Sequence, residues 1–334
     1  MQNKRFDEVP LSKELQRAVA AMKFEVMTPI QSQAIPYIME GRDVIGQAQT
    51  GTGKTLAFGI PIIERLERRG RDLEALVLCP TRELAVQITA ELKKLARFRR
   101  DVHVVAVYGG QPIQKQFDAL QKGARIVVGT PGRIMDHMNR GTIRLDAVRF
   151  VVLDEADRML DMGFVDDMKT ILFALPDERQ TLLFSATIQS VISVVGKFQR
   201  DPYLVNVVGD TITVPQVEQA FVEVKPWRKL DAVCHLIDTY NPMSSLVFCN
   251  TKRRVDEIVR HLKDRGYDAD SLHGDMSQAR RDSAMLRFRK RLSKVLVATD
   301  VAGNPSTALP AVDAFPPTGG YDQRQMQVGF KILF

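Results

Sequence analysis

A phosphate-binding pattern lies at residues 48–55, which read AQTGTGKT. Its glycines let backbone N–H groups approach phosphate oxygens without a Cβ in the way. A helix-like run follows at 56–66, and its N-terminus would direct further N–H groups and the helix dipole at the same anion. The lysine can reach the terminal phosphates, and the last threonine can hold Mg²⁺. The predicted phosphate-binding residues are Thr50, Gly51, Thr52, Gly53, Lys54 and Thr55.

Two carboxylates follow a second apolar run further along the chain. Asp154 and Glu155 begin the sequence DEAD directly after residues 150–153, which read FVVL. Because α/β proteins bind their ligands at the carboxyl ends of parallel strands, this position suits catalysis. Asp154 suits Mg²⁺, directly or through water, and Glu155 suits orienting and deprotonating an attacking water. A glycine turn and an acidic turn without function would use similar residues, but the strand–loop–helix context favours the catalytic interpretation.

The elements that would position these residues alternate between short apolar runs and amphipathic stretches as far as residue 302. Such alternation is typical of an α/β fold with a parallel sheet. In the first half, strands are predicted at 43–46, 75–79, 102–107, 125–128, 150–153 and 181–184, with helices at 82–95, 113–121 and 164–175. The pattern loosens between Pro202 and Pro215, which we interpret as a linker.

A second strand–helix series follows this linker. Its predicted strands lie at 220–224, 245–249, 269–272 and 294–298, and its helices at 230–240, 252–262 and 278–291. Four prolines between Gly303 and Gly320 then oppose regular structure. The predicted organisation is a first domain at 1–207, a linker at 208–218, a partial second domain at 219–302 and a divergent tail at 303–334.

Composition excludes several classes of protein. With 334 residues, 45% hydrophobic and 26% charged, the chain is typical of a globular protein of two domains. The net charge of +7 is compatible with a nucleic-acid partner but equally with a basic enzyme. Three scattered cysteines predict buried thiols in a reducing compartment, and no apolar run suggests a signal peptide or a membrane span. We therefore expect a cytoplasmic protein without a membrane partner.

Further short motifs occur in order along the chain. They read FEVMTPIQ at 24–31, PTRELA at 80–85, GG at 109–110, TPGR at 130–133, SAT at 185–187, VFCNT at 247–251 and LHGD at 272–275. Together with AQTGTGKT and DEAD, they resemble the DEAD-box RNA helicases over about residues 6–302. The resemblance implies two RecA-like parallel-sheet domains, the second incomplete here, facing each other across a cleft. It also implies that ATP and Mg²⁺ bind in the cleft and that RNA, single-stranded or duplex, lies across both domains with little sequence specificity.

The resemblance also implies roles for individual residues. Gln31 would read the adenine edge, with Phe6 or Phe24 covering the ring, although Met27 stands where proline is more usual in the family. Ser185 and Thr187 would contact the acidic motif and couple the ATP state to unwinding. The implied RNA contacts are Arg82, Gly110, Thr130, Arg133, Asn250, Thr251, Gly274, Arg281 and Thr299.

After Ala302 the sequence leaves the family pattern, which would continue with Ala-Arg-Gly and later supply His-Arg-x-Gly-Arg with the arginine fingers. We therefore expect this chain to bind ATP with little RNA-stimulated hydrolysis. Three alternatives remain open at this point: an ATP-dependent DNA helicase, a nucleotide- and RNA-binding protein without turnover, and an unstable product whose second domain does not fold.

Overall fold

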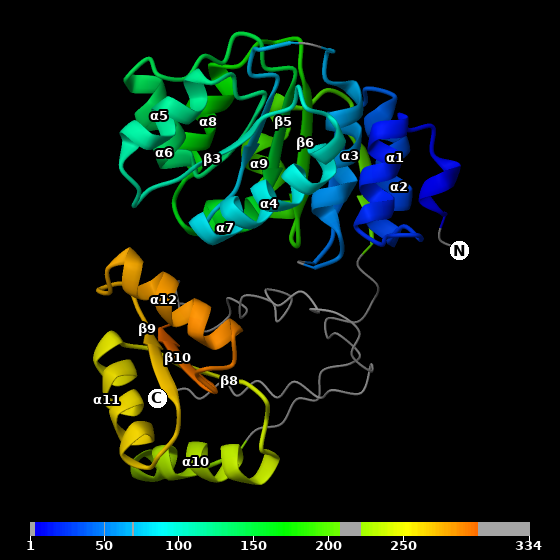
Figure 1. The fold of residues 1–334 in the computed structure, drawn as a ribbon. Helices are drawn as coiled ribbons and strands as arrows, with labels where there is room; N and C mark the ends of the chain where they lie inside the picture. Colours follow the sequence, from blue (N-terminus) through cyan, green and yellow to red (C-terminus); the bar gives the residue numbers. More distant parts are fainter. Residues whose placement is uncertain (1–3, 50, 69, 208–221, 300–334) are drawn as a thin grey trace. The chain divides into compact units, whose positions relative to one another are not determined.

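The computed structural model describes residues 4–49, 51–68, 70–207 and 222–299 (Figure 1). The chain divides into two compact units, Met1–Gly209 and Asp210–Phe334, and each is described by itself. Most of the predicted linker, and the tail at 303–334, lie outside the described residues. The fold class predicted from the alternating pattern, α/β with parallel sheets, is confirmed in both units.

The first unit is built on a seven-stranded parallel sheet with the order β3-β4-β2-β5-β6-β1-β7. Its strands are β1 (Val44–Gln47), β2 (Ala75–Leu78), β3 (Val104–Val107), β4 (Ile126–Gly129), β5 (Phe150–Asp154), β6 (Gln180–Ser185) and β7 (Tyr203–Asn206). The central strands β2, β5 and β6 are buried along their whole length because both faces of the sheet are covered. The register pairs Asp154 with Phe184 and Gln47 with Ser185, so β1, β5 and β6 end at one edge of the sheet.

Helices cover both faces of this sheet (Figure 1). One face packs against α1 (Lys13–Ala21), α2 (Pro29–Met39), α3 (Lys54–Arg65) and α4 (Arg82–Leu95). The other face packs against α6 (Pro131–Asn139), α7 (Ala156–Asp161), α8 (Val165–Phe173) and α9 (Gln189–Val195), while α5 (Ile113–Gln121) lies beside β3. Phe58 fills the core on the first face and Ile171 on the second, and both are fully buried. This core fixes the strand ends from which the candidate site projects.

The second unit has a three-stranded parallel sheet among its described residues, with the order β8-β10-β9. Its strands are β8 (Ser245–Cys249), β9 (Ala269–Leu272) and β10 (Val295–Thr299). Apolar residues of α10 (Lys229–Tyr240) and α11 (Lys252–Asp264) pack on one face. On the other face, Phe288 of α12 (Gln278–Arg289) packs with Leu296.

Two predictions about the segment between the series are wrong. The interpretation of residues 202–215 as a linker begins too early, because Tyr203–Asn206 form β7 and pair in parallel with β1; the predicted domain boundary at residue 207 lies after this strand. The expected strand at 220–224 is not formed in its described part, since residues 222–224 belong to no strand. An alternating apolar pattern gives only a local preference, and a strand also needs a partner; β8, β9 and β10 pair with one another instead. Within the described ranges, no helix is both long and apolar enough to cross a membrane.

Candidate nucleotide and nucleic-acid site

The predicted phosphate-binding loop connects β1 to α3. Gly51 and Gly53 have φ angles of +84° and +89°, which glycine adopts without a Cβ penalty. The Thr52 hydroxyl donates to the carbonyl of Gln49 at 2.8 Å and closes the turn. α3 begins at Lys54, so the N–H groups of its first turn, which lack partners within the helix, lie directly after the loop. This arrangement offers backbone donors and a helix N-terminus to an anion.

The loop and the acidic strand end meet through a buried ion pair. Lys54 Nζ lies 3.7 Å from Asp154 Oδ1, and the two side chains are only 6% and 4% exposed. Burial raises the pKa of Asp154, the ammonium of Lys54 lowers it and the Glu155 carboxylate raises it, and together these effects place the pKa at about 6. A cation, a carboxylate and helix N–H groups in one buried place can bind a polyphosphate together with a divalent cation.

Thr55, in the first turn of α3, lies against α4. Burial raises the pKa of Glu91, and hydrogen bonds with Thr55 and Gln87 partly offset that rise. The Thr55 hydroxyl is therefore held next to the loop by a neighbouring helix. Thr50 lies outside the described residues.

Glu155 adopts an uncommon backbone conformation at the start of α7. Its φ and ψ are both 50°, in the left-handed region that non-glycine residues rarely occupy. Its carboxylate is buried and accepts a hydrogen bond from Arg158 Nη1 at 3.0 Å. Strained backbone of this kind concentrates at functional sites. Sequence reasoning missed Arg158, although its i,i+3 spacing from Glu155 on a short helix was a usable signal.

The SAT segment contacts the last residue of the DEAD motif. Asp157 Oδ2 accepts hydrogen bonds from the Thr187 N–H at 2.9 Å and from the Thr187 hydroxyl at 3.0 Å. The Ser185 hydroxyl accepts from the Asp157 N–H at 3.3 Å and donates to the Thr187 carbonyl at 2.7 Å. Ser185 and Thr187 are thus brought together with the acidic motif. Sequence reasoning did not single out Asp157, which makes the contact.

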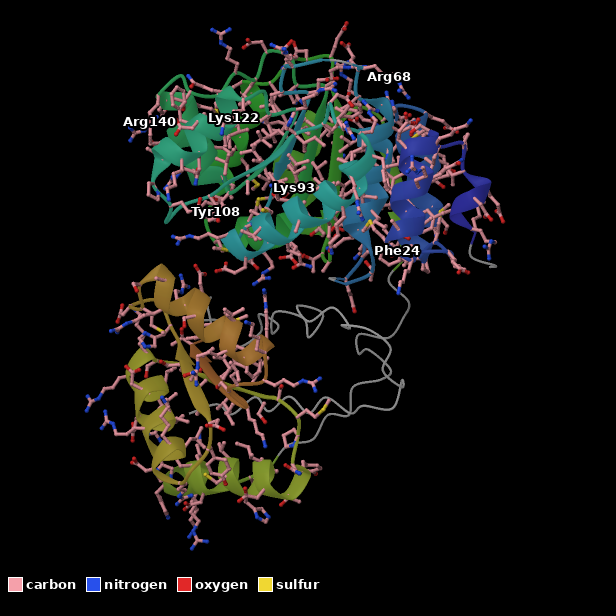
Figure 2. All side chains as sticks on the ribbon, viewed as in Figure 1. Phe24, Arg68, Lys93, Tyr108, Lys122 and Arg140 are labelled. Atoms are coloured by element: carbon pink, nitrogen blue, oxygen red, sulfur yellow. The ribbon has the colours of Figure 1, made fainter. Side chains whose placement is uncertain are left out.

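Gln31 links α2 to the phosphate-binding loop. Its Oε1 accepts from the Thr28 N–H at 2.9 Å, and its Nε2 donates to the Gly53 carbonyl at 3.0 Å. A Cβ on Gly53 would lie 2.4 Å from Gln31 Nε2 and would displace this amide, and the φ of +89° at Gly53 disfavours any other residue. The amide retains one N–H and one lone pair for a ligand. Of the two candidate aromatic residues, Phe6 is buried at 5% exposure, whereas Phe24, which is labelled in Figure 2, is 44% exposed.

Four predicted RNA contacts gather around the turn after β3. Gly110 has φ of +89°, and a Cβ there would lie 2.1 Å from Arg82 Nη1, so the guanidinium packs on the glycine. Arg133 Nη1 donates to the carbonyl of Gln111 at 3.1 Å. Thr130 is buried at the start of α6, and its N–H donates to the carbonyl of Val107 at 3.1 Å. These groups lie beyond the carboxyl ends of neighbouring strands and can hold phosphates of a nucleic-acid backbone.

The second unit shows a similar arrangement at the carboxyl ends of its strands. Thr299, at the end of β10, pairs with Cys249, at the end of β8, and Asn250 and Thr251 follow Cys249 directly. Thr251 caps α11, since its Oγ1 accepts from the Arg254 N–H at 3.3 Å. Gly274 follows the neighbouring strand β9, and Arg281 lies in the first turns of α12. Asn250, Thr251, Gly274 and Thr299 therefore share one edge of this sheet.

Two family models match the chain. Residues 28–194 match the model described as DEAD/DEAH box helicase, which spans the phosphate-binding loop and the DEAD motif, and residues 228–311 match the helicase conserved C-terminal domain. The chain belongs to the DEAD/DEAH box helicase family.

Curated members of the DEAD/DEAH box family are similar over most of this chain. The DEAD-box ATP-dependent RNA helicase CshA of Geobacillus kaustophilus is 50% identical over 298 residues, which cover 89% of this chain and 64% of the relative. The protein of the same name from Bacillus subtilis is 48% identical over 298 residues, with 89% and 60% covered. The chain thus spans 64% or less of the length of these two relatives.

Solved structures of DEAD-box proteins are also similar. Dbp5 of S. cerevisiae bound to RNA and ADP BeF3 is 32% identical with a TM-score of 0.80, covering 89% of this chain and 76% of that one. A DEAD box protein from Methanococcus jannaschii is 38% identical with a TM-score of 0.60, covering 90% and 81%.

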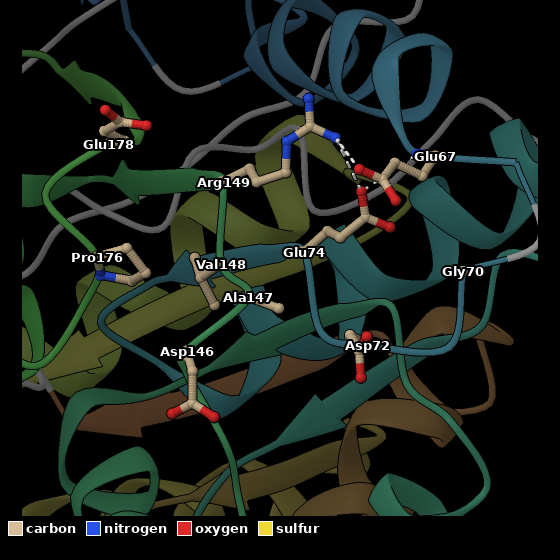
Figure 3. A pocket seen from close by; sticks show the side chains of 10 residues that line it. All are labelled: Glu67, Gly70, Asp72, Glu74, Asp146, Ala147, Val148, Arg149, Pro176 and Glu178. Atoms are coloured by element: carbon tan, nitrogen blue, oxygen red, sulfur yellow. Dashed lines mark hydrogen bonds and ion pairs between the residues drawn. The ribbon is translucent and has the colours of Figure 1, made fainter.

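A cavity of about 330 Å³ in this DEAD-box chain lies away from the candidate site (Figure 3). It is lined by residues that precede β2, β5 and β6, at the amino ends of the strands. Arg149 Nη1 lies 3.1 Å from a Glu67 oxygen and 3.4 Å from a Glu74 oxygen in its wall. These charges are paired with one another, and the cavity is at the opposite end of β5 from Asp154.

Proposed function

We propose that this chain binds and hydrolyses ATP and couples that cycle to local opening of RNA duplexes. The observation that carries the proposal is the buried contact between Lys54 and Asp154, which joins the phosphate-binding loop to the acidic strand end. The similarity to proteins named ATP-dependent RNA helicases supports ATP and RNA as the two substrates.

The side chains divide the nucleotide chemistry among them. Backbone N–H groups of the loop and of α3 would bind the phosphates, with the ammonium of Lys54 on their terminal oxygens. Thr55 and Asp154 would hold Mg²⁺, which when bound neutralises charge that develops on the phosphates. The Glu155 carboxylate would orient and deprotonate the attacking water. The spare N–H and lone pair of Gln31 would read the adenine edge, with Phe24 as the accessible aromatic.

RNA would bind along the carboxyl ends of the strands in both units. The candidate contacts in the first unit are two guanidinium groups, a threonine and a glycine turn, which suit phosphate and sugar rather than base edges. We therefore propose binding with little sequence specificity. Because Ser185 and Thr187 hold Asp157, they would connect the nucleotide state to this RNA-binding edge. We also place the activity in the cytoplasm, since all three cysteines are buried and unpaired.

The test compares ATP hydrolysis by the chain with no nucleic acid, with single-stranded RNA and with DNA of the same sequence. We expect any stimulation to come from RNA and not from DNA, and to be small in this chain because its residues after Ala302 lack the arginine-bearing segment of the family. Glu155→Gln should bind ATP with Mg²⁺ normally while hydrolysing it at least about 100-fold more slowly. Glu178→Gln is the matched control, because this exposed carboxylate lies at the opposite edge of the sheet.

Each outcome of this assay separates the proposal from its rivals. Equal stimulation by DNA would favour a DNA helicase. Binding of both ATP and RNA without hydrolysis would favour a binding protein without turnover. Absence of ATP binding would contradict the proposal altogether.

A further inference from the structure

The turn after β3 receives contacts from three helices. The Arg82 guanidinium on α4 packs on Gly110, and Arg133 on α6 donates to the carbonyl of Gln111. On α5, Gln116 Nε2 donates to the carbonyl of Tyr108 at 2.8 Å. The position of this turn, where Tyr108 is labelled in Figure 2, therefore depends on groups from α4, α5 and α6.

A buried chain of hydrogen bonds extends from this turn into α6. Gln116 Oε1 lies 3.3 Å from His137 Nε2, and His137 Nδ1 lies 2.7 Å from the Thr142 hydroxyl. His137 is fully buried and Gln116 is 2% exposed. Neither residue lies in a motif used above. Because buried polar groups need hydrogen-bond partners, each member of this hydrogen-bonded series must keep its neighbour.

The contacts assign the donors along the chain. The Gln116 amide nitrogen donates to the Tyr108 carbonyl, so the amide oxygen must face His137. The proton of a neutral His137 is therefore on Nε2, which donates to that oxygen. Nδ1 is then the acceptor for the Thr142 hydroxyl at 2.7 Å. The same hydroxyl lies 3.1 Å from the His137 carbonyl, which already accepts the Thr142 N–H at 2.9 Å, so its one proton is free for Nδ1. Every group between Thr142 and Tyr108 is satisfied in this arrangement.

The surroundings of His137 favour this neutral form. Burial lowers the pKa of His137, the nearby charges of Arg133 and Arg140 lower it further, and Asp136 opposes them. Protonation of His137 is thus disfavoured at neutral pH, and the neutral ring keeps one donor, Nε2, and one acceptor, Nδ1.

We propose that Gln116 and His137 are positioning residues that hold the Tyr108–Gly110 turn against α6, so that the groups that grip RNA keep their spacing. The proposal rests on the proposed function, because it assigns Gly110, Arg82, Thr130 and Arg133 to RNA. Neither Gln116 nor His137 needs to touch RNA. Their effect passes through the carbonyl of Tyr108 on one side and through α6 on the other.

The prediction is a selective loss of RNA affinity. His137→Asn keeps a polar group near the Nδ1 position but cannot reach Gln116, which leaves a buried amide oxygen without its donor. His137→Gln is the matched variant, because its longer amide can donate to Gln116 at the place of Nε2. Gln116→Met removes both of the glutamine's bonds at similar volume. Arg140→Ala is the surface control at the C-terminal cap of the same helix, since Arg140 is 57% exposed and pairs with Asp136 (Figure 2).

The experiment measures two affinities for each full-length variant. Fluorescence anisotropy with a labelled 12-nucleotide oligouridine gives RNA affinity, and a fluorescent adenine nucleotide with Mg²⁺ gives nucleotide affinity. We expect His137→Asn and Gln116→Met to bind RNA about tenfold more weakly, equivalent to about 1.4 kcal/mol, with nucleotide affinity within about twofold of wild type. His137→Gln and Arg140→Ala should bind RNA like the wild type.

The outcomes distinguish this inference from the proposed function. A wild-type chain that binds nucleotide but no RNA overturns both. Wild-type RNA binding with unchanged affinity in His137→Asn and Gln116→Met overturns the inference alone. Equal losses of RNA and nucleotide affinity in these two variants, or loss of folding, would show a general structural role and overturn it as well.

Discussion

Acidification should remove the Mg²⁺-dependent part of nucleotide binding at a higher pH than an ordinary aspartate would allow. The group responsible is Asp154, whose pKa is raised to about 6 because the carboxyl is buried next to Glu155, with Lys54 only partly compensating. A raised pKa means that the proton is lost late as the pH rises. The carboxylate that can hold Mg²⁺ is therefore fully present above about pH 7 and disappears as the pH falls through about 6.

The size of the effect follows from the titration. With a pKa of about 6, roughly 90% of the chains carry ionised Asp154 at pH 7 and roughly 10% at pH 5. The factor by which Mg²⁺ strengthens nucleotide binding should therefore fall about tenfold between these pH values if only the ionised form binds the cation. An aspartate with the ordinary pKa of about 3.9 would change by less than about 10% over the same range.

The assay titrates a fluorescent adenine nucleotide at pH 5, 6 and 7, with Mg²⁺ and with EDTA, and takes the ratio of the two affinities. Phosphate groups of the nucleotide also titrate near this range, so Asp154→Asn is measured in parallel to remove their contribution. The wild-type ratio should fall about tenfold relative to that of the variant. A ratio that is the same at pH 5 and pH 7 in both proteins would refute the assignment of Asp154 to the metal.

Three further predictions concern single side chains. Lys54→Ala should weaken nucleotide binding at least about 100-fold, because it removes the buried cation from the phosphates; unchanged affinity in the same titration would contradict the loop assignment. Gln31→Ala should reduce the preference for ATP over GTP more than it reduces affinity for inorganic triphosphate, since the amide reads the base; a wild type that binds both nucleotides equally would contradict this. Arg125→Met should lower the free energy of unfolding in urea by about 3 kcal/mol, because it leaves Glu74 and Asp101 without their fully buried partner, and a loss under about 1 kcal/mol would count against it.

Much of the fold and of the candidate site could be predicted because the chemistry is local in sequence. Loop residues 51–55 must be contiguous to surround one phosphate group, and Asp154 must follow its strand directly. The same locality explains why six strands of the first sheet were predicted, since β2, β4, β5 and β6 are short runs buried on both faces. β7 was not predicted, because only Val205 of its four residues is buried and the sequence there lacks the apolar run of a buried strand.

Contacts between distant segments could not be predicted in this way. The hydrogen bond from Gln31 to Gly53 joins residues 22 positions apart, and the bond from His137 to Gln116 joins residues 21 apart. Neither spacing belongs to a helix or strand period, so no pattern indicates it. Such contacts depend on how helices pack across the sheet, which tertiary structure alone decides.

The two ends of the first sheet carry opposite arrangements of charge, and this difference supports the location of the site. At the amino ends, Arg125 is fully buried and bonded to both Glu74 and Asp101, so each charge there is matched by another within the fold. At the carboxyl ends, Asp154 has a raised pKa although Lys54 lies 3.7 Å away, and Glu155 is held in left-handed backbone. A fold selected for stability alone would relieve both features, for example with an apolar pair in place of the ions. Both features are explained if a bound polyphosphate and a bound cation complete the charge balance at this end of the sheet. The interactions there would then stabilise the ligand complex and not the ligand-free fold.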